Sequence, residues 1–213
     1  MRFVKNRIDD IINKGILTGK TVLEFGCVGM GEDDEYGGVN WIHGRAKAVA
    51  KKIVGLDMNK EGIERLKEKG YDVRLQNVEE KFDLKEKFDV VLVEEVLEHL
   101  NNVGMAFENI RRHLKKDGLL IITTPNAHAL SFFLQRLFRN EISGVSITDH
   151  VLWYDENTLK TLLKRYNFEV QEIWYVQPLP VVRTFKSRII NFIFSFFPDR
   201  VGRNLCCIAR KID

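Results

Sequence analysis

The sequence contains little cysteine and no long apolar run. Only 3 of its 213 residues are cysteine, and two of these, Cys206 and Cys207, are adjacent. This pattern provides neither a disulfide framework nor a C-x-x-C metal knuckle, and it favours a reduced, intracellular protein. The N-terminus lacks the apolar segment of a signal peptide, and no stretch approaches the roughly 20 apolar residues of a membrane-spanning helix. We therefore expect a cytoplasmic protein.

A strong excess of one charge is also missing. The formal net charge is +3, and lysines and arginines alternate with acidic residues. Nothing in this pattern calls for a nucleic acid as a partner. Hydrophobic residues make up 45% of the chain and charged residues 30%, which is typical of a globular domain. The length suits one domain over 1–213.

No G-x-x-x-x-G-K-[ST] phosphate loop is present, and the glycines after the first apolar run have a different spacing. Residues 22–25 lead into Gly26, Gly29 and Gly31, which form G-x-x-G-x-G and not the G-x-G-x-x-G of dinucleotide-binding enzymes. A second apolar run ends in Asp57, whose carboxylate can accept hydrogen bonds from both hydroxyls of a ribose. Together these features predict a nucleoside site without a pyrophosphate. A purely structural strand–helix turn is the alternative.

Apolar runs alternate with helix-like segments along most of the chain. We expect strands at 21–25, 53–57, 72–76, 88–93, 119–124, 168–176 and 205–211, a turn at 116–118, and helices at 3–14, 41–52, 59–69, 95–100, 103–114 and 154–166. Strands that alternate with helices specify a doubly wound parallel sheet. The last two strands lack room for a simple helical crossover. We therefore predict a three-layer α/β fold with a mostly parallel seven-stranded sheet and an antiparallel C-terminal edge strand.

Five motifs in this order resemble those of class I S-adenosylmethionine-dependent methyltransferases. They are V-L-E-F-G-C-V-G (22–29), V-G-L-D (54–57), N-V-E (77–79), F-D-V-V-L-V-E-E-V-L-E-H (88–99) and L-K-K-D-G-L-L-I-I-T-T-P-N (114–126). The resemblance runs from about residue 20 to 177 and resumes at the terminal strand. It is strongest to the branch of ubiquinone-pathway O-methyltransferases and of glycan and small-molecule methyltransferases. It implies a Rossmann-like fold and methyl transfer from S-adenosylmethionine to a small, sugar- or lipid-linked acceptor, at an oxygen.

The resemblance also implies which residues bind the cofactor. They follow the ends of the first four strands: Glu24, Gly26, Cys27 and Gly29 at the methionine moiety, Asp57 at the ribose, Met58, Asn77 and Val78 at the adenine, and Glu94 beside the sulfonium. The family usually has Asp at the position of Asn77, but an amide oxygen can also accept a hydrogen bond from an exocyclic amine.

The loop of residues 30–40 is longer than the usual turn of the family and rich in acids and glycine. It either folds over the cofactor, with His43 approaching the cofactor carboxylate, or is a solvated loop followed by a surface histidine.

Three side chains after the fourth strand could act on an acceptor hydroxyl, which must lose its proton. Glu95, Glu98 and His99 are spaced i, i+3, i+4, on one face of the predicted helix. The pattern resembles the one by which ubiquinone-pathway and small-RNA 2′-O-methyltransferases hold a divalent cation, which implies Mg²⁺, Mn²⁺ or Zn²⁺ here. His150 or His128 would complete the ligand set. Without a metal, His99 or His150 would be the general base, with Glu95 beside the sulfonium; catalysis by positioning alone is the third alternative.

Two segments, at about 127–148 and 178–203, interrupt the alternating pattern as insertions. In the first, one apolar helical face would line the acceptor pocket or pack on the sheet: Leu130, Phe133, Leu134, Leu137 and Phe138. In the second, residues 184–197 are apolar around most of a helix and have basic flanks. This segment predicts a peripheral membrane contact, a cap over a lipid-linked acceptor, packing on the first insertion, or a homodimer contact.

Two other functions are consistent with the sequence. One is a cofactor-binding or scaffold protein of the same fold without turnover. The other is a nucleotide-dependent oxidoreductase, which the glycine spacing disfavours.

Overall fold

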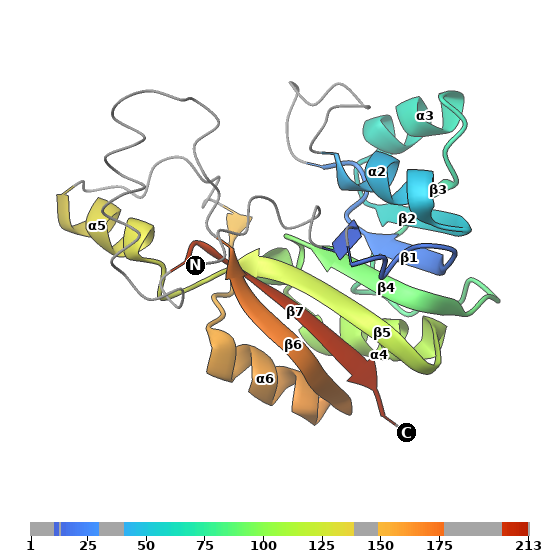
Figure 1. The fold of residues 1–213 in the computed structure, drawn as a ribbon. Coiled ribbons are helices and arrows are strands. Elements are labelled where there is room, and N and C mark those ends of the chain that lie inside the picture. The colour runs from blue at the N-terminus through green and yellow to red at the C-terminus, as the bar shows by residue number, and fades with distance from the viewer. Residues whose placement is uncertain (1–10, 13, 30–40, 139–148, 177–201, 213) are drawn as a thin grey trace.

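Seven segments of the chain pair into a single sheet that helices cover on both faces (Figure 1). The computed structural model describes residues 11–12, 14–29, 41–138, 149–176 and 202–212. The strands are β1 (Thr21–Phe25), β2 (Lys52–Asp57), β3 (Val73–Leu75), β4 (Phe88–Glu94), β5 (Leu114–Pro125), β6 (Phe168–Val176) and β7 (Asn204–Lys211). Their order is β3-β2-β1-β4-β5-β7-β6, parallel from β3 to β5, with β7 antiparallel to both β5 and β6. The predicted fold class is confirmed, with one correction: the C-terminal strand β7 is antiparallel but lies between β5 and β6, so that β6 is the edge strand.

Helices connect the strands, and three of them begin at polar capping residues. The helices are α2 (Ile42–Val49), α3 (Lys60–Glu68), α4 (Val103–His113), α5 (Leu130–Phe138) and α6 (Glu156–Arg165). The side chains of Asn59, Asn102 and Asp155 accept backbone N–H groups in the first turns of α3, α4 and α6. Asp155 is the N-cap of α6, and Thr158 completes a capping box with it.

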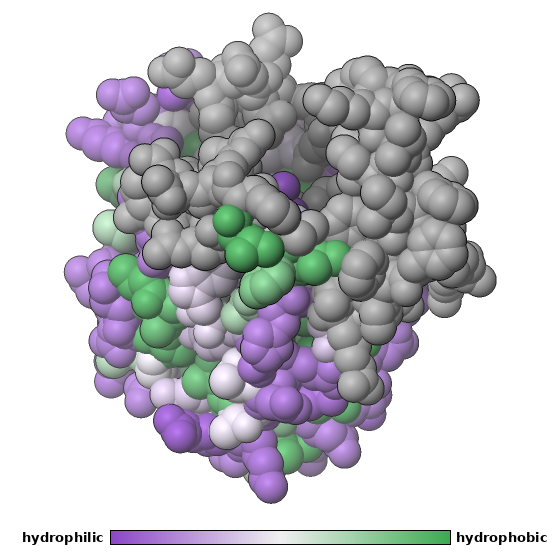
Figure 2. Space-filling model, turned by 90° about the vertical axis from the view of Figure 1, so that its left-hand side faces the viewer, coloured by the Kyte–Doolittle hydropathy of each residue, from purple (hydrophilic) through white to green (hydrophobic). Residues whose placement is uncertain are grey.

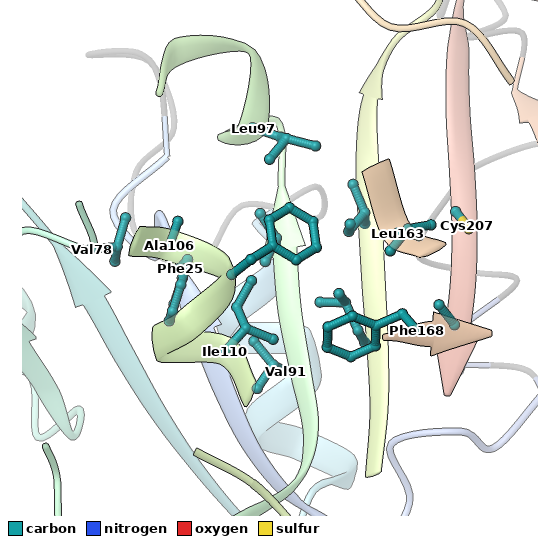
Figure 3. Close-up of a cluster of buried hydrophobic side chains, with 14 of the residues drawn as sticks. Phe25, Val78, Val91, Leu97, Ala106, Ile110, Leu163, Phe168 and Cys207 are labelled. Carbon is teal, nitrogen blue, oxygen red and sulfur yellow. The ribbon is translucent and has the colours of Figure 1, made fainter. Parts of the chain in front are cut away.

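The apolar side chains divide between the two faces of the sheet because successive residues of a strand point in opposite directions. In β4, Val91 and Val93 belong to the core that packs under α4 and α6, whereas Val90 and Leu92 belong to the core under α2. Figure 3 shows Ile110 of α4 on the first of these faces. Each fully buried side chain of this size contributes about 1.5–3 kcal/mol to folding. The two cores therefore fix the parallel strands, whose carboxyl ends all lie at the same end of the sheet.

The prediction of a helix at 95–100 is wrong. Glu95 adopts a left-handed backbone with φ of 49°, while its N–H still donates to the carbonyl of Thr123 at 3.0 Å. The chain therefore turns sharply at the end of β4, and only a single 3₁₀ turn, η1 (Leu97–His99), follows. The premise that Glu95, Glu98 and His99 share one α-helical face is lost with this helix.

The turn expected at 116–118 is instead part of β5. Opposite Phe88 the strand pairs at Leu114, and opposite Val90 it pairs at Leu119. The extra residues form a bulge, and Asp117 takes a positive φ of 57°. The sequence signal for a turn thus corresponds to an irregularity within the strand.

The insertion around α5 differs from its expected packing. Phe133 and Leu137, both on the predicted apolar face, are exposed, whereas Phe132 is buried. Figure 1 shows α5 extending away from the sheet, so it does not pack there as a cover. The N-terminal part of the helix expected at 3–14, the loop 30–40 and the segment 184–197 lie outside the described residues. Among the described helices, none combines the length and the apolar character that crossing a bilayer requires.

Candidate active site

The turn after β1 requires glycine. Gly26 has a φ of 82°, and a Cβ at this position would lie 2.4 Å from Cγ2 of Val96. The N–H of Gly26 donates to the carbonyl of Leu56 at 2.8 Å, which continues the pairing of β1 with β2. Gly29 also has a positive φ, of 77°. Two residues of the turn therefore lack side chains, and the side chains of Cys27 and Val28 between them are buried. The turn lies where the strand order reverses between β1 and β4, the usual ligand crevice of an open α/β sheet.

Asp57 joins the end of β2 to this turn. Its Oδ2 accepts the N–H of Val28 at 2.9 Å, and its Oδ1 accepts the N–H of Asn59 at 2.9 Å. An ionised carboxylate has about four lone-pair positions, so two hydrogen bonds leave capacity for the hydroxyls of a ribose. Asp57 therefore lies beside the glycine turn with acceptor capacity left, and ribose binding stays a prediction.

Two apolar side chains are exposed beside Asp57. Met58 is 63% exposed and Leu75, the last residue of β3, is 51% exposed. The N–H of Gln76 donates to the carbonyl of Asp57 at 2.9 Å, which keeps the ends of β2 and β3 together. Leu75 was not among the predicted site residues. Its signal in the sequence is its place at the carboxyl end of a strand, next to the polar pair Gln76 and Asn77.

The predicted adenine residues differ in how their side chains are placed. The Oδ1 of Asn77 accepts the N–H of Glu79 at 2.9 Å, and its Nδ2 donates to Glu80 at 3.1 Å. The side chain of Val78 is buried in the core, so only its backbone can face a base.

The residues within and behind the glycine turn are buried. Nδ1 of His43 lies 2.6 Å from Oε2 of Glu24, and both side chains are inside the core. His43 is therefore not the surface histidine of one interpretation, and Glu24 is buried against it. Burial, together with the nearby Glu24 and Asp57 carboxylates, raises the pKa of the Cys27 thiol well above its usual range. Cys27 therefore stays a neutral thiol.

At the end of β4, Glu94 and Glu95 have different environments. Glu94 is the last strand residue and pairs in register with Thr123 of β5. Oε2 of Glu95 accepts a hydrogen bond from Nδ2 of Asn204 at 2.8 Å. Asn204 begins β7 and was not predicted, because only the tertiary structure brings β7 beside this loop.

Glu98, His99 and His150 form a cluster of potential metal ligands. One donor atom of each lies within 4.8 Å of a donor atom of the other two. Glu98 is only 1% exposed, and its Oε2 accepts the hydroxyl of Thr124 at 3.0 Å. The structure thus brings together two of the three predicted metal ligands, and His150, not Glu95, lies with them. His128 is also elsewhere, since its Nε2 lies 3.7 Å from a carboxylate oxygen of Asp155.

The two imidazoles of the cluster have different surroundings. Nδ1 of His99 lies 3.1 Å from the carbonyl of Asp149; a carbonyl can only accept, so Nδ1 is the donor, and in the neutral ring Nε2 carries the lone pair. The ring of His150 meets that of His99 edge to face, with centroids 4.7 Å apart. Nδ1 of His150 is buried and has no hydrogen-bond partner in the described part of the chain. Burial and the neighbouring His99 lower the pKa of His150, so it is neutral at pH 7.

Aromatic side chains extend from this cluster toward α5. Trp153 lies 5.7 Å from the ring of His150 and 5.3 Å from that of Phe132, and the guanidinium of Arg203 lies 5.6 Å from the Phe132 ring. Phe133, on the same helix, is exposed, and Figure 2 shows apolar surface on this face of the molecule. Sequence reasoning did not identify Trp153 or Arg203. The arrangement forms an aromatic, partly exposed wall beside the carboxylate and imidazoles.

Comparison with known proteins identifies similar sequences. The chain matches the model of a methyltransferase domain family over residues 2–173. It is 32% identical over 124 residues to the ubiquinone biosynthesis O-methyltransferase of Bradyrhizobium sp. (strain ORS 278), which covers 55% of this chain and 45% of that protein. It is 32% identical over 139 residues to the mitochondrial ubiquinone biosynthesis O-methyltransferase of Rattus norvegicus, covering 61% and 37%. Each match spans less than half of the relative.

The fold is also similar to that of solved structures. A crystal structure of an S-adenosylmethionine-dependent methyltransferase from Archaeoglobus fulgidus superposes with a TM-score of 0.65, covering 96% of this chain and 92% of that one. The two sequences are 18% identical, so this likeness concerns the fold alone.

Proposed function

Because this chain belongs to the class I S-adenosylmethionine-dependent methyltransferases, we propose that it transfers the methyl group of that cofactor to a hydroxyl oxygen of a small, sugar- or lipid-linked acceptor. The observation that carries the proposal is the link between Asp57 and the glycine turn, at the reversal of strand order. A carboxylate that can accept hydrogen bonds from ribose hydroxyls thus lies beside a turn that contains two glycines, which supports the proposal. The names of the relatives support oxygen as the methylated atom.

The residues present fit S-adenosylmethionine in charge, shape and polarity. Gly26 leaves room that a Cβ would fill, Asp57 accepts from the ribose, and Met58 and Leu75 offer exposed apolar surface to a flat base. When bound, the cofactor supplies an electrophilic methyl group on a sulfonium. The negative carboxylates of Glu94 and Glu95 would stabilise the positive charge of that sulfonium. Holding the acceptor oxygen in line with the methyl–sulfur bond then supplies much of the rate.

The cluster of Glu98, His99 and His150 suits the acceptor side of the reaction. A carboxylate with two imidazoles is a donor set for Zn²⁺ and, less well, for Mn²⁺ or Mg²⁺. A divalent cation held there would lower the pKa of the acceptor hydroxyl. The hydrogen bond from Nδ1 of His99 to the carbonyl of Asp149 fixes the orientation of the ring and leaves Nε2 to bind a cation. The outer contacts of metal-bound histidines act in the same way.

The same cluster also provides a base that needs no metal. His150 is neutral at pH 7 and its Nδ1 is buried without a partner in the described residues, so it can take the acceptor proton. Glu98 would then stabilise the imidazolium that forms. The wall of Trp153 and Phe132 supplies an apolar surface for an aromatic or lipid portion of the acceptor.

The cofactor part of the proposal is tested by calorimetry with S-adenosylhomocysteine and NAD. We expect binding of the first and none of the second. Absence of S-adenosylhomocysteine binding would overturn the proposal.

The transfer part is tested with a panel of phenols, sugars and prenylated phenols as acceptors, with and without EDTA. Loss of turnover with EDTA, restored by Zn²⁺, Mn²⁺ or Mg²⁺, supports the cation. Undiminished turnover excludes it, and the His150 variant then decides between a general base and catalysis by positioning alone. In either case Glu98→Gln and His150→Phe should lower turnover at least tenfold. The matched control is His128→Asn, outside the cluster. Cofactor binding without transfer to any acceptor would indicate a protein of this fold without turnover.

A further inference from the structure

The chain between β3 and β4 forms neither helix nor strand. Residues 76–87 contain turns and bends in place of regular structure. Backbone N–H and C=O groups in such a segment need partners outside regular structure, because leaving them unpaired when buried is costly. Many of these partners come from one helix, α4, and from the residue that caps it.

Asn109 is the centre of this contact. Its Nδ2 donates to the carbonyls of Val78 at 2.9 Å and Glu80 at 2.7 Å, and its Oδ1 accepts the N–H of Phe82 at 3.4 Å. The side chain is only 1% exposed. A single buried amide therefore fixes three peptide groups of the segment.

His113 continues the contact one turn further along α4. Nδ1 lies 2.8 Å from the carbonyl of Asn109, so it carries the proton, and Nε2 accepts the N–H of Leu84 at 3.0 Å. The ring of Phe82 stacks on the imidazole with centroids 4.7 Å apart and an interplanar angle of 19°. His113 is buried and fixed in one tautomer.

Asn102, the N-cap of α4, holds the start of the segment. Its N–H donates to the carboxylate of Glu79, and its Nδ2 donates to the carbonyl of Glu79 at 3.4 Å. Asn102, Asn109 and His113 are spaced i, i+7, i+11, which places them along one face of a helix. We refer to these three residues as the polar stripe of α4.

The polar stripe lies directly behind the residues that would face adenine. It binds Val78 and Glu79 through their backbone groups, and Glu79 donates in turn to Oδ1 of Asn77. The side chain of Val78 is buried on the α4 side of the sheet, beside Ala106 (Figure 3). The backbone of Val78 is thereby fixed from two directions.

We infer that the polar stripe of α4 positions Asn77 and the Val78 backbone for the edge of the base, and thereby makes the site discriminate adenine from other purines. The inference rests on the proposed function, since it presumes that adenosine binds beside Asp57. The three stripe residues are positioning residues, because they act through the segment and do not touch the base.

The test compares two ligands that differ only at the base edge, S-adenosylhomocysteine and S-inosylhomocysteine. Calorimetry on the purified chain gives the ratio of their dissociation constants. We expect Asn109→Leu to reduce this ratio about tenfold, chiefly by weakening the adenosyl ligand, because a displaced hydrogen-bond pair is worth about that factor. His113→Phe keeps the ring that stacks on Phe82 but cannot accept from Leu84, and it should act in the same direction. It carries the test if Asn109→Leu does not fold.

Two controls separate positioning from general stability. His113→Gln retains an acceptor and a donor, so it should keep the wild-type ratio. Asp89→Asn lowers stability at the opposite end of the sheet and should leave the ratio unchanged. A ratio within twofold of wild type in both Asn109→Leu and His113→Phe, despite lower melting temperatures, would overturn the inference. A wild-type chain that binds neither ligand would instead overturn the proposed function.

Discussion

The carboxylate of Asp57 accepts the backbone N–H of Val28 at 2.9 Å, and the end of β2 thereby fixes the turn after β1. The link joins two segments that are 29 residues apart in the chain. Since it uses one oxygen of Asp57 and the N–H of Asn59 uses the other, the orientation of the carboxylate is set before a ligand binds. Such preorganisation reduces the ordering cost of binding.

Asp57→Asn should weaken the binding of S-adenosylhomocysteine by about 10- to 100-fold. The amide keeps the size of the side chain but loses the charge and one acceptor oxygen, and hydrogen bonds to charged groups contribute about 1.5–3 kcal/mol. Calorimetry measures the loss. Asp117→Asn, a bulge residue at the other end of the sheet, is the matched control and should leave affinity unchanged. Equal affinities for all three proteins would contradict the assignment of Asp57.

Gly55→Ala should destabilise the fold behind the glycine turn by about 1–3 kcal/mol, through overpacking. The added Cβ would lie 2.6 Å from Cβ and Sγ of Cys27 and 2.9 Å from Cε1 of His43. Thermal unfolding should show a melting temperature lower by several degrees. Cys27→Ala in the same chain removes Sγ and should recover part of the loss. If the two substitutions are additive, the crowding does not arise from Cys27.

The sheet could be predicted from the sequence because its signals are local. Runs such as Val90–Val93, bounded by polar turns, specify buried parallel strands, and Asp57 follows such a run directly. Glycines at Gly26 and Gly29 mark positive φ angles that other residues avoid. These local features sufficed for the fold class and for the position of Asp57.

The candidate site at the end of β4 could be predicted only in part because long-range contacts set its geometry. The left-handed Glu95 arises where the chain leaves β4 while still paired with Thr123 of β5, which no local pattern encodes. His150 approaches His99 from a distant segment, and the sequence offered it as one of two alternatives with His128. The polar stripe of α4 could not be predicted, because Asn109 and His113 cannot be told from other polar helix residues without the position of the segment that they bind.

Asp89→Asn should lower stability by about 1–2 kcal/mol and flatten its dependence on acid pH. Although burial raises the pKa of Asp89, hydrogen bonds from Lys115 and Thr21 outweigh it and hold the pKa well below its usual range. A lowered folded-state pKa gives stability that is present above the unfolded value of about 3.9 and is lost as pH falls below it. Urea unfolding at pH 3 to 7 measures this. Parallel curves for the two proteins would show that Asp89 is not responsible.

His113 should make the fold less stable in mild acid. Burial lowers its pKa most strongly; Arg112 and Lys87 act in the same direction, and Asp83 and the carbonyl of Asn109 oppose them. Between the folded pKa and the ordinary value of about 6.5, the unfolded chain binds more protons than the folded chain. The contribution of neutral His113 to the stability of the fold is therefore fully present above about pH 6.5 and is lost as pH falls below it. Structurally, a protonated Nε2 can no longer accept the N–H of Leu84.

Urea unfolding of wild type and His113→Gln between pH 5 and 8 isolates this effect from other histidines. The glutamine cannot titrate but can still accept from Leu84 and donate to the carbonyl of Asn109, so its stability should change less with pH. The difference in unfolding free energy between the two proteins should shift in favour of the glutamine variant as pH falls from 7 to 5. His128→Asn, at an exposed histidine, should instead follow the wild-type curve. A wild-type curve parallel to that of His113→Gln would mean that Leu84 and His113 keep their contact when the ring is protonated.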